Sequence, residues 1–406
     1  MGRRRPCTSK KARNKAGDDS TGDRITALPL DLRARIASLL NYWQVVQLSV
    51  LSQAWRHIHH HTPVVKINLY DFYLGEPDPV LGLLDEPSIL SVRVALGRRA
   101  QDASASRVDT LRLAYLVDDR RLRRHADRIV GLTDARYIRI RAPFLEEPVR
   151  DAWTLDLPPS ARDLEVIARH HPAPAIAGPG AAALRKLDLD WMVIREWPHL
   201  PSLRFLSLDK VTIKASFAPG AWCPLLEELD ISCSRIEHAR VDICLPFLRF
   251  MDLDGLDVNP DGRCQVPPFG EITIDAPELL ELDVNCGAPG STADYKSFTL
   301  RAPRLHFLFW CNQFAERVAI DVGRPGSVKV GAIVLTTVYT RELKDYQEQM
   351  MRMLEGLLPG VPPESIADVS KPFITLEECD DSDDDDEDDK VEKLTCDIMA
   401  LMSRGI

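Results

Sequence analysis

The sequence predicts an α/β fold in which three short N-terminal helices precede a long repeat solenoid whose strands form one parallel sheet. Apolar residues recur at helical spacing between residues 23 and 62, which indicates amphipathic helices. From residue 108 onward, a pattern of apolar, two residues, apolar, one residue, apolar recurs nine or ten times. Repetition with a period of about 20 to 50 residues is typical of solenoids.

The two ends of the chain carry most of its charge imbalance. The 406 residues have a formal net charge of −10, yet residues 377–389 alone hold 11 acidic groups and no basic one. Residues 1–15 hold only basic charges, seven in number: Arg3, Arg4, Arg5, Lys10, Lys11, Arg13 and Lys15. We therefore expect residues 1–22 to be a disordered basic arm. Residues 377–406 are expected to be an acidic disordered tail, compatible with a short helix around 394–402.

The composition also indicates the cellular compartment in which we expect the protein. The nine cysteines include no CxxC pair, which favours reduced thiols over a disulfide framework. No apolar run is long enough to span a membrane. The basic arm matches a split nuclear import signal, and a generic basic arm explains it equally well. We expect the protein in the nucleus, the cytoplasm or both, with no membrane contact.

Catalysis and nucleic-acid binding are not indicated. The chain contains no P-loop, GxGxxG, GxSxG or HExxH motif, and no nucleophile and base can be paired. Apart from its charged ends the body is only mildly acidic, which argues against a nucleic-acid binder. No complete set of metal ligands appears at the required spacing. We therefore expect no enzyme activity, no metal and no cofactor.

Residues 23–62 read as three helices. Leu28, Leu32, Ile36 and Leu39 share one face, with Pro29 suited to the first turn. A second apolar segment spans 45–51, and Ser52 is placed to cap a third helix that carries Trp55 and Ile58. A segment this short cannot enclose a core of its own, so we expect it to dock on another surface.

Residues 63–340 are predicted to form the irregular solenoid. Its repeats start 19 to 31 residues apart, mostly within the range of leucine-rich repeats, in which each unit supplies one parallel strand. The apolar triplets are Val108/Leu111/Leu113, Ala135/Ile138/Ile140, Ala161/Leu164/Val166, Leu184/Leu187/Leu189, Leu203/Leu206/Leu208, Leu226/Leu229/Ile231, Leu248/Met251/Leu253, Leu279/Leu282/Val284 and Leu305/Leu308/Trp310, with Val330/Ile333/Leu335 as a candidate tenth.

Residues 341–376 are predicted to cap the last layer of the solenoid. A helix over 342–358 places Leu343, Tyr346, Met350, Met353 and Leu357 on one stripe. After Pro359 and Gly360, the segment 373–376 is predicted to add a closing strand. Such a unit covers apolar surface that a solenoid would otherwise expose.

The segment from Asp23 to Arg56, with Leu28-Pro29, Leu48 to Ser52 and Trp55-Arg56, resembles an F-box. Together with the repeats and their Pro-containing entries, such as Cys223-Pro224-Leu225, it resembles the plant F-box/leucine-rich-repeat family. The segment departs from the family pattern at Asn41-Tyr42-Trp43 and at Gln53-Ala54.

The resemblance implies a substrate receptor of an SCF ubiquitin ligase. The F-box would bind the Skp-type adaptor, and through it the cullin, while the solenoid would bind an unknown protein substrate. The alternative is that the apolar helical residues pack on the first turn of the solenoid. The adaptor-binding residues implied are Leu28, Pro29, Leu32, Ile36, Leu39, Leu40, Val45, Leu48, Leu51 and Trp55.

Strand alternation predicts which side chains the solenoid presents. Residues between the buried apolar positions point to the outer, concave face of the sheet. In chain order the central position is Arg112, Arg139, Glu165, Asp188, Ser207, Asp230, Asp252, Asp283 and Phe309, so the face changes from basic to acidic. Phe205, Phe250 and Phe307 are predicted on the same face as apolar anchors, although they could equally pack beside their neighbours.

We hypothesise that the acidic column receives a basic segment of the substrate. The simpler alternative is that exposed strand positions are merely polar. The candidate substrate-binding residues are Arg112, Arg139, Asp188, Asp230, Asp252, Asp283, Phe205, Phe250 and Phe307. The function predicted is substrate recognition in an SCF-type ligase. The alternative is a non-catalytic scaffold or chaperone-like binder of basic proteins that acts without ubiquitination.

Overall fold

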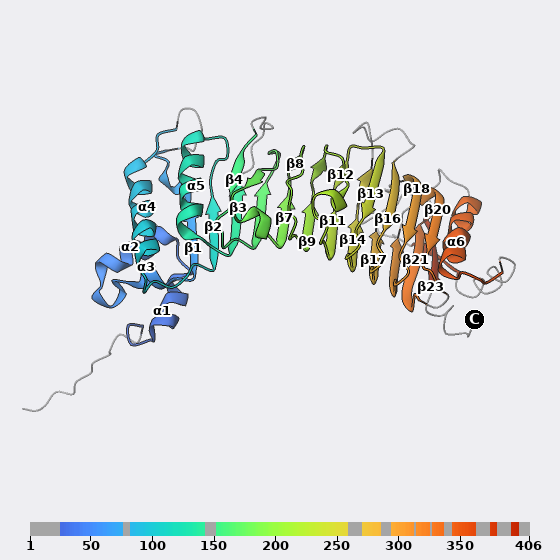
Figure 1. The fold of residues 1–406 in the computed structure, drawn as a ribbon, viewed down its shortest axis with the longest axis horizontal. Coiled ribbons are helices and arrows are strands. Elements are labelled where there is room, and N and C mark those ends of the chain that lie inside the picture. The colour runs from blue at the N-terminus through green and yellow to red at the C-terminus, as the bar shows by residue number, and fades with distance from the viewer. Residues whose placement is uncertain are drawn as a thin grey trace, which may run out of the picture.

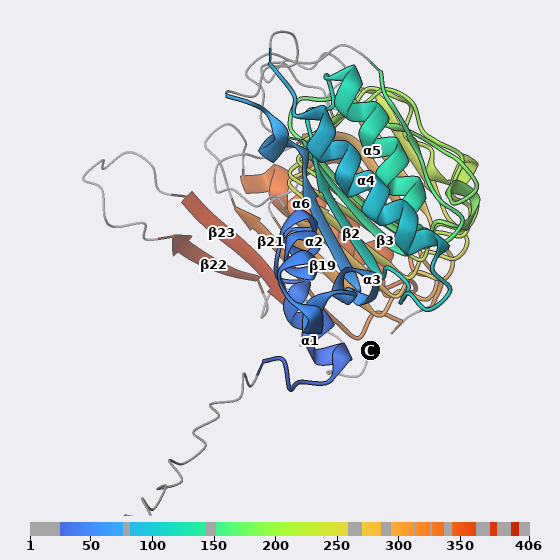
Figure 2. The same cartoon turned by 90° about the vertical axis from the view of Figure 1, so that its left-hand side faces the viewer.

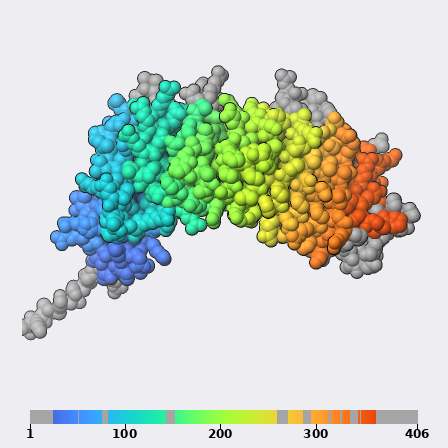
Figure 3. Space-filling view, in the orientation of Figure 1, coloured from blue at the N-terminus to red at the C-terminus, as the bar shows by residue number. Residues whose placement is uncertain are grey.

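The computed structural model describes residues 25–75, 82–142, 152–258, 270–285, 294–311, 314–324, 327–336, 343–362, 374–379 and 391–397. Helices at the N-terminal end lead into a long parallel β-solenoid (Figure 1). The space-filling view shows one arched body along which the chain advances from end to end (Figure 3). The predicted basic arm, residues 1–22, and the acidic run 380–390 lie outside the described residues.

The N-terminal segment is helical, as predicted. Its elements are α1 (Leu30–Ala37), α2 (Tyr42–Leu51), the 3₁₀ turn η1 (Gln53–Trp55) and α3 (Ile58–His61). Gln44 accepts a hydrogen bond from the backbone N–H of Asn41 at 3.1 Å, which closes the first turn of α2. The single third helix predicted after Ser52 is instead η1 followed by α3, because a turn at Arg56 and His57 separates Trp55 from Ile58.

The solenoid is built on one large sheet. From β1 to β21 its successive strands pair in parallel, one per turn. These strands are β1 (Val64–Asn68), β2 (Thr110–Ala114), β3 (Tyr137–Ala142), β5 (Asp163–Ala168), β7 (Lys186–Asp190), β9 (Phe205–Asp209), β11 (Glu228–Ser232), β14 (Phe250–Asp254), β17 (Glu281–Asn285), β19 (Phe307–Cys311) and β21 (Val330–Thr336).

The apolar triplets form the core, as predicted. In the nine triplets from Val108 to Trp310, every side chain is at most 5% exposed. The solenoid begins one strand earlier than the first triplet, because β1 pairs with β2 and buries Val65 and Ile67. β1 is as long as β2, but the segment between them is longer than the spacing of the later repeats, so β1 does not appear in the periodic pattern.

The predicted tenth triplet is wrong by two residues. In the register of β19 with β21, Leu308 lies opposite Gly331 and Trp310 lies opposite Ile333. The tenth unit is therefore Val328/Gly331/Ile333, while Val330 is 44% exposed. The periodic pattern breaks here because a glycine occupies the second apolar position. A Cβ at Gly331 would lie 2.0 Å from the carbonyl oxygen of Leu308.

A second layer closes each turn opposite the large sheet. Its first part is helical: α4 (Glu86–Gln101) packs against α5 (Arg120–Thr133). Asp119 caps α5 by accepting hydrogen bonds from the N–H groups of Arg121 and Leu122. Viewed from the N-terminal end, α4 and α5 lie on one side of β2 and β3 (Figure 2).

Beyond α5 the return path is made of strands rather than helices. One small sheet pairs β4 (Thr154–Asp156) with β6 (Ala175–Ala177). A second small sheet contains β8 (Val193–Ile194), β10 (Thr212–Ile213), β12 (Arg235–Ile236) and β15 (Asp257–Val258). A third contains β13 (Arg240–Cys244), β16 (Glu271–Asp275), β18 (Asp294–Arg301) and β20 (Phe314–Asp321). The expectation of a single parallel sheet is thus incomplete, because the returning segments pair with one another in small parallel sheets of their own.

The turns are aligned by a ladder of left-handed residues at one corner. Trp191, Lys210 and Cys233 have φ values of 61°, 52° and 49°, and Gly255 has a φ of 61° at the equivalent place. Each donates its N–H to a carbonyl of the following turn, for example from Lys210 to Ser232 at 2.8 Å. These bonds satisfy backbone groups that the bend removes from the large sheet.

The C-terminal cap is partly as predicted. Helix α6 (Leu343–Leu357) packs against β20 and buries Met350, Met353 and Leu357. The predicted closing strand is present as β22 (Ile374–Cys379), but it joins the sheet through β23 (Val391–Asp397), which pairs antiparallel with β21.

Two expectations for the tail are therefore corrected. The helix proposed around 394–402 is a strand as far as Asp397, and its remainder lies outside the described residues. The boundary at residue 377 falls within β22. The physical reason is the open edge of β21, whose unpaired backbone groups are satisfied by a further strand.

Candidate functional site

Part of the predicted adaptor-binding set forms the interior of the helical segment. Val45 is 1% exposed and packs with Ala34, Ala37 and Ile58, against which Leu40 and Trp55 are partly buried. The segment thus has a very small core, and Val45 contributes to it rather than to a surface. Leu28 and Leu48 are half-buried, and the side chain of Leu51 lies outside the described set.

The rest of the predicted set faces solvent. Leu32 and Ile36 on α1 and Leu39 in the turn that follows it are 40%, 41% and 74% exposed. Pro29 is also exposed. Six large apolar residues of this segment are exposed, and we call them together the helical apolar surface: Ile25, Leu30, Leu32, Ile36, Leu39 and Val50. Among the described residues, roughly half of all strongly exposed large apolar side chains lie here, and such concentration marks an interaction surface.

Arg99 joins the helical segment to the solenoid. Its side chain is 4% exposed and donates hydrogen bonds to the carbonyl oxygens of His59, Thr62 and Ser106 at 2.9, 2.7 and 2.9 Å. A further bond reaches Oγ1 of Thr62 at 3.0 Å. Because these acceptors lie on α3, on the link to β1 and on the loop before β2, the three segments are held together. Sequence reasoning missed this residue, since an arginine on a helix is usually exposed.

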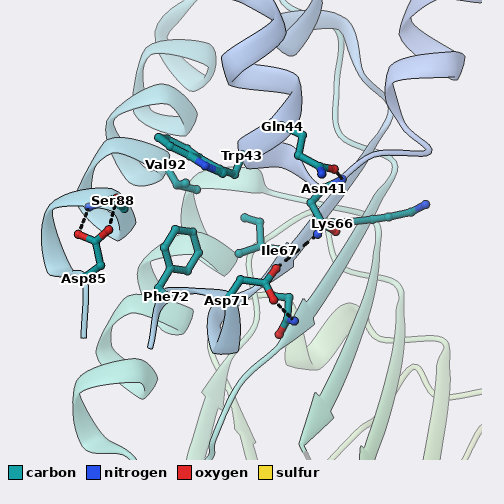
Figure 4. Close-up of a pocket in the computed structure, with 11 residues that line it drawn as sticks. Asn41, Trp43, Gln44, Lys66, Ile67, Asp71, Phe72, Asp85, Ser88 and Val92 are labelled. Carbon is teal, nitrogen blue, oxygen red and sulfur yellow. Dashed lines mark hydrogen bonds between the residues drawn. The ribbon is translucent and has the colours of Figure 1, made fainter. Parts of the chain in front are cut away.

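A pocket of about 200 Å³ lies at the same junction, between α2, β1, the 3₁₀ turn η2 (Leu69–Phe72) and α4 (Figure 4). Its floor includes Trp43, Ile67 and Phe72. Its polar groups bond to one another: Asn41 and Asn68 both donate to Asp71, at 3.4 and 2.6 Å. Ser88 likewise donates to Asp85 at the start of α4. The pocket is therefore part of the joint between the helices and the first turn.

The outer face of the large sheet carries the predicted charge sequence. Strand register places the central residues of neighbouring strands opposite one another, as predicted from alternation. The column begins with Lys66 on β1 and continues through Arg112, Arg139, Glu165, Asp188, Ser207, Asp230, Asp252, Asp283 and Phe309 to Ala332.

The two acids of the central column in the early strands, Glu165 and Asp188, have basic partners. Arg139 pairs with Glu165 at 3.0 Å, and Lys186 pairs with Asp188 at 3.1 Å. Arg139 and Asp188, both in the predicted substrate-binding set, are thus engaged within the sheet. Arg112 is exposed.

Acids in the later strands differ. Within the described residues, none of the six carboxylates on the outer face of β11, β14 and β17 forms an ion pair: Glu228, Asp230, Asp252, Asp254, Glu281 and Asp283. Asp230 accepts hydrogen bonds from Ser207 and Ser232 at 3.1 and 2.8 Å. Asp283 and Asp254 each have a buried Oδ1 with no hydrogen-bond partner among the described groups, as do Asp188 and Asp190 on β7, so the later acids differ in lacking an ion pair. This part of the face is locally uncompensated.

These carboxylates line a groove of about 310 Å³ that we call the acidic groove, formed by Glu228, Asp230, Phe250, Asp252, Glu281, Asp283 and Phe307 above Leu229 and Met251. Phe250 and Phe307 therefore lie beside the acids, as predicted. Phe205 lies in the same row on β9, next to Glu228 in the strand register. Sequence reasoning missed Glu228 and Glu281, although the alternation that placed the phenylalanines on this face applies to them as well.

Crowding of the carboxylates changes their acidity. Partial burial, with the negative charges of Asp283, Asp230 and Asp254, raises the pKa of Asp252 to about 6. Burial and the charge of Asp254 also raise the pKa of Asp283. A raised pKa means that the ionised carboxylate is unfavourable in this groove, and a cationic group of a bound partner would stabilise it.

Replacing Asp252 with asparagine is expected to stabilise the protein at pH 7 by about 1 kcal/mol. Between the ordinary pKa and the raised one, the folded state binds more protons than the unfolded state, so stability falls as pH rises through this window. A carboxyl pKa raised to about 6 corresponds to about 3 kcal/mol for a fully buried group, and solvent exposure of Asp252 reduces the effect. Urea unfolding at pH 7 and pH 4 measures it.

The gain should vanish at pH 4, where Asp252 is already protonated in the folded protein. Asp242→Asn on β13, outside the groove, is the control and should change stability by less than about 0.5 kcal/mol. Equal stabilisation at both pH values would contradict the electrostatic account.

The described residues contain no group of three or more His, Cys, Asp or Glu side chains arranged to hold a metal ion. Over the same ranges no helix has the length and apolar character to cross a membrane. Scans against protein-family models, curated proteins and solved structures found no match to this chain. The chain thus consists of N-terminal helices followed by a long parallel β-solenoid, with an apolar surface at one end and an acidic groove in its sheet.

Proposed function

We propose that this protein is a non-catalytic recognition subunit that bridges two protein partners. The main supporting observation is that one chain carries two unlike surfaces at separate places in its fold. The helical apolar surface belongs to the N-terminal segment, and the acidic groove belongs to β11, β14, β17 and β19. Figure 1 shows these strands several turns away from α1 and α2. An apolar face suits a stable partner, and a charged groove suits selection of a particular sequence.

The adaptor proposed for the helical apolar surface is a Skp-type protein of an SCF ubiquitin ligase. The resemblance of residues 23–57 to an F-box supports this proposal. So does the exposure of Leu32, Ile36 and Leu39, which the resemblance assigns to the adaptor contact. Ubiquitin transfer would occur elsewhere in the complex, and this chain would contribute proximity and orientation.

Replacing Ile36 and Leu39 together with aspartate is expected to reduce capture of a purified Skp-type adaptor at least about tenfold, since charge in an apolar interface is costly. Both side chains are exposed, so the fold should be retained. Pull-down and calorimetry with the full chain measure the effect. Phe247→Asp is the matched control, because Phe247 is 51% exposed on the solenoid, away from the helices. Absence of adaptor binding by the unmodified chain would refute the SCF proposal.

A second function is favoured by the acidic groove. The chain would bind basic proteins as a scaffold or chaperone-like partner without ubiquitination. The two proposals differ in their dependence on the helices. A binder of this second kind keeps its partner and its cellular effect after Ile36→Asp/Leu39→Asp, whereas a ligase receptor keeps the partner but no longer lowers its abundance.

A further inference from the structure

We propose that the acidic groove binds a basic segment of a partner protein in a polyproline II-like conformation, with lysine or arginine at every third position. This inference rests on the proposed role of the solenoid in substrate recognition and adds the chemical class of the substrate. Three observations support it. The carboxylates of the groove form no ion pair, aromatic and acidic residues alternate across the neighbouring strands, and the groove has the size of a few side chains.

Charge defines the ligand. Six outer-face carboxylates on β11, β14 and β17 form no ion pair within the described residues, whereas Glu165 and Asp188 on earlier strands are paired. Neighbouring strands are about 4.8 Å apart, so the Asp230, Asp252 and Asp283 column concentrates like charge. The protein retains an arrangement that opposes its own stability, and cationic side chains are the groups that would compensate it.

The row beside this column sets the spacing. In strand order it reads Phe205, Glu228, Phe250, Glu281 and Phe307, so aromatic and acidic residues alternate. Each type recurs at every second strand, a distance of about 9.6 Å. A polyproline II helix has three residues per turn and rises about 3.1 Å per residue, so every third side chain points the same way about 9.3 Å further along.

A β-strand does not match this row. Its side chains return to one face every second residue, about 6.7 Å apart, which is a multiple of neither one nor two strand spacings. A polyproline II segment lying across the strands can place successive basic side chains at Glu228 and Glu281. There each cation also lies beside the ring of Phe250, where a cation–π contact is favourable.

The size of the groove agrees with a peptide. About 310 Å³ accommodates a few side chains and excludes a folded domain. Asp252 and Asp283 line the groove two residues further along their strands, where long lysine and arginine side chains can reach them. A polyproline II segment also loses little conformational freedom on binding, because it is already extended in solution.

The test is a fluorescence-anisotropy titration of the full chain with a labelled synthetic peptide of Lys-Pro-Ala repeats. Binding is expected at low ionic strength and should weaken with added salt. A peptide of the same length and lysine number, with its lysines moved to every second position within one stretch, should bind at least about fivefold more weakly, because its cations do not match the spacing of Glu228 and Glu281.

Removing the carboxylate charges tests the site. Asp230→Asn/Asp252→Asn/Asp283→Asn is expected to weaken binding at least about tenfold while keeping side-chain shape. The charge-matched control is Asp242→Asn/Glu271→Gln/Asp275→Asn on β13 and β16, in another sheet, and should alter affinity by less than about twofold. Phe250→Ala should weaken binding of the Lys-Pro-Ala peptide more than binding of the peptide with rearranged lysines.

Three results would overturn the proposal. The first is equal affinity for both peptides, and the second is an equal loss of peptide affinity in the groove variant and the control variant. The third is peptide binding only after deletion of residues 1–22. The last would assign the groove to the chain's own basic arm. Adaptor capture by the groove variants should stay unchanged. Failure of peptide binding with capture intact therefore rejects only this inference, and failure of capture alone rejects only the SCF assignment.

Discussion

Replacing Arg99 with methionine is expected to lower the free energy of unfolding by about 3 kcal/mol. The guanidinium bonds the carbonyl oxygens of His59, Thr62 and Ser106, and its loss leaves these acceptors without their donor. A buried polar group that loses its partner costs about 1 to 3 kcal/mol, so relief from burying one charge should not offset the loss. Chemical unfolding followed by circular dichroism measures the total.

The functional consequence should be local. Because solenoid turns contact mainly their neighbours, Arg99→Met should increase hydrogen exchange in α2, α3 and β1 and leave β11 to β19 protected. Adaptor capture should weaken while peptide binding in the acidic groove persists. Arg98→Met is the matched control, since Arg98 is exposed on the same helix and should change stability by less than about 0.5 kcal/mol. An equal effect of the two substitutions would contradict the role of Arg99.

Gly331→Ala is expected to destabilise the C-terminal end of the solenoid by about 3 kcal/mol. The new Cβ would lie 2.0 Å from the carbonyl oxygen of Leu308, so β19 and β21 would have to separate. Overpacking of a close contact typically costs about 1 to 3 kcal/mol, and this contact is with backbone, which yields least. Hydrogen exchange should rise in β21 and α6 before the global transition.

Gly97→Ala provides the contrast. Gly97 lies within α4, and a Cβ added there would meet no atom of another segment within 4 Å, so alanine should stabilise the helix by up to about 1 kcal/mol. If Gly331→Ala were as mild as Gly97→Ala, the close approach of β21 to Leu308 would not be the reason for glycine.

Much of the large sheet and of its outer face could be predicted because both follow from alternation along short strands. Leu229 and Ile231 point inward, so Asp230 must point outward, and regular repeats bring Asp252 beside it. The charge column therefore needed only local periodicity and a constant register. The tenth repeat failed where this condition failed, since Gly331 removes the apolar signal.

The remaining features depend on contacts between segments that are distant in sequence. Alternation does not show that Arg99 is enclosed by His59, Thr62 and Ser106, or that Val45 lies inside a small core while Leu39 remains exposed. The groove is similar. Alternation placed its aspartates and phenylalanines on one face, but the alternation of Glu228 and Glu281 with the phenylalanines became clear only from the pairing of β9 to β19.

The sequence by itself determined the parallel repeat sheet, the position of its core and the change from basic to acidic charge along its outer face. These are local properties, because hydrophobic periodicity decides which side of a strand is buried. Only the tertiary structure decided which charges remain unpaired, how the return path is built and which apolar helical residues stay on the surface. Those outcomes depend on contacts between side chains of different turns, and the local sequence of one turn does not show which side chains of the next turn it will contact.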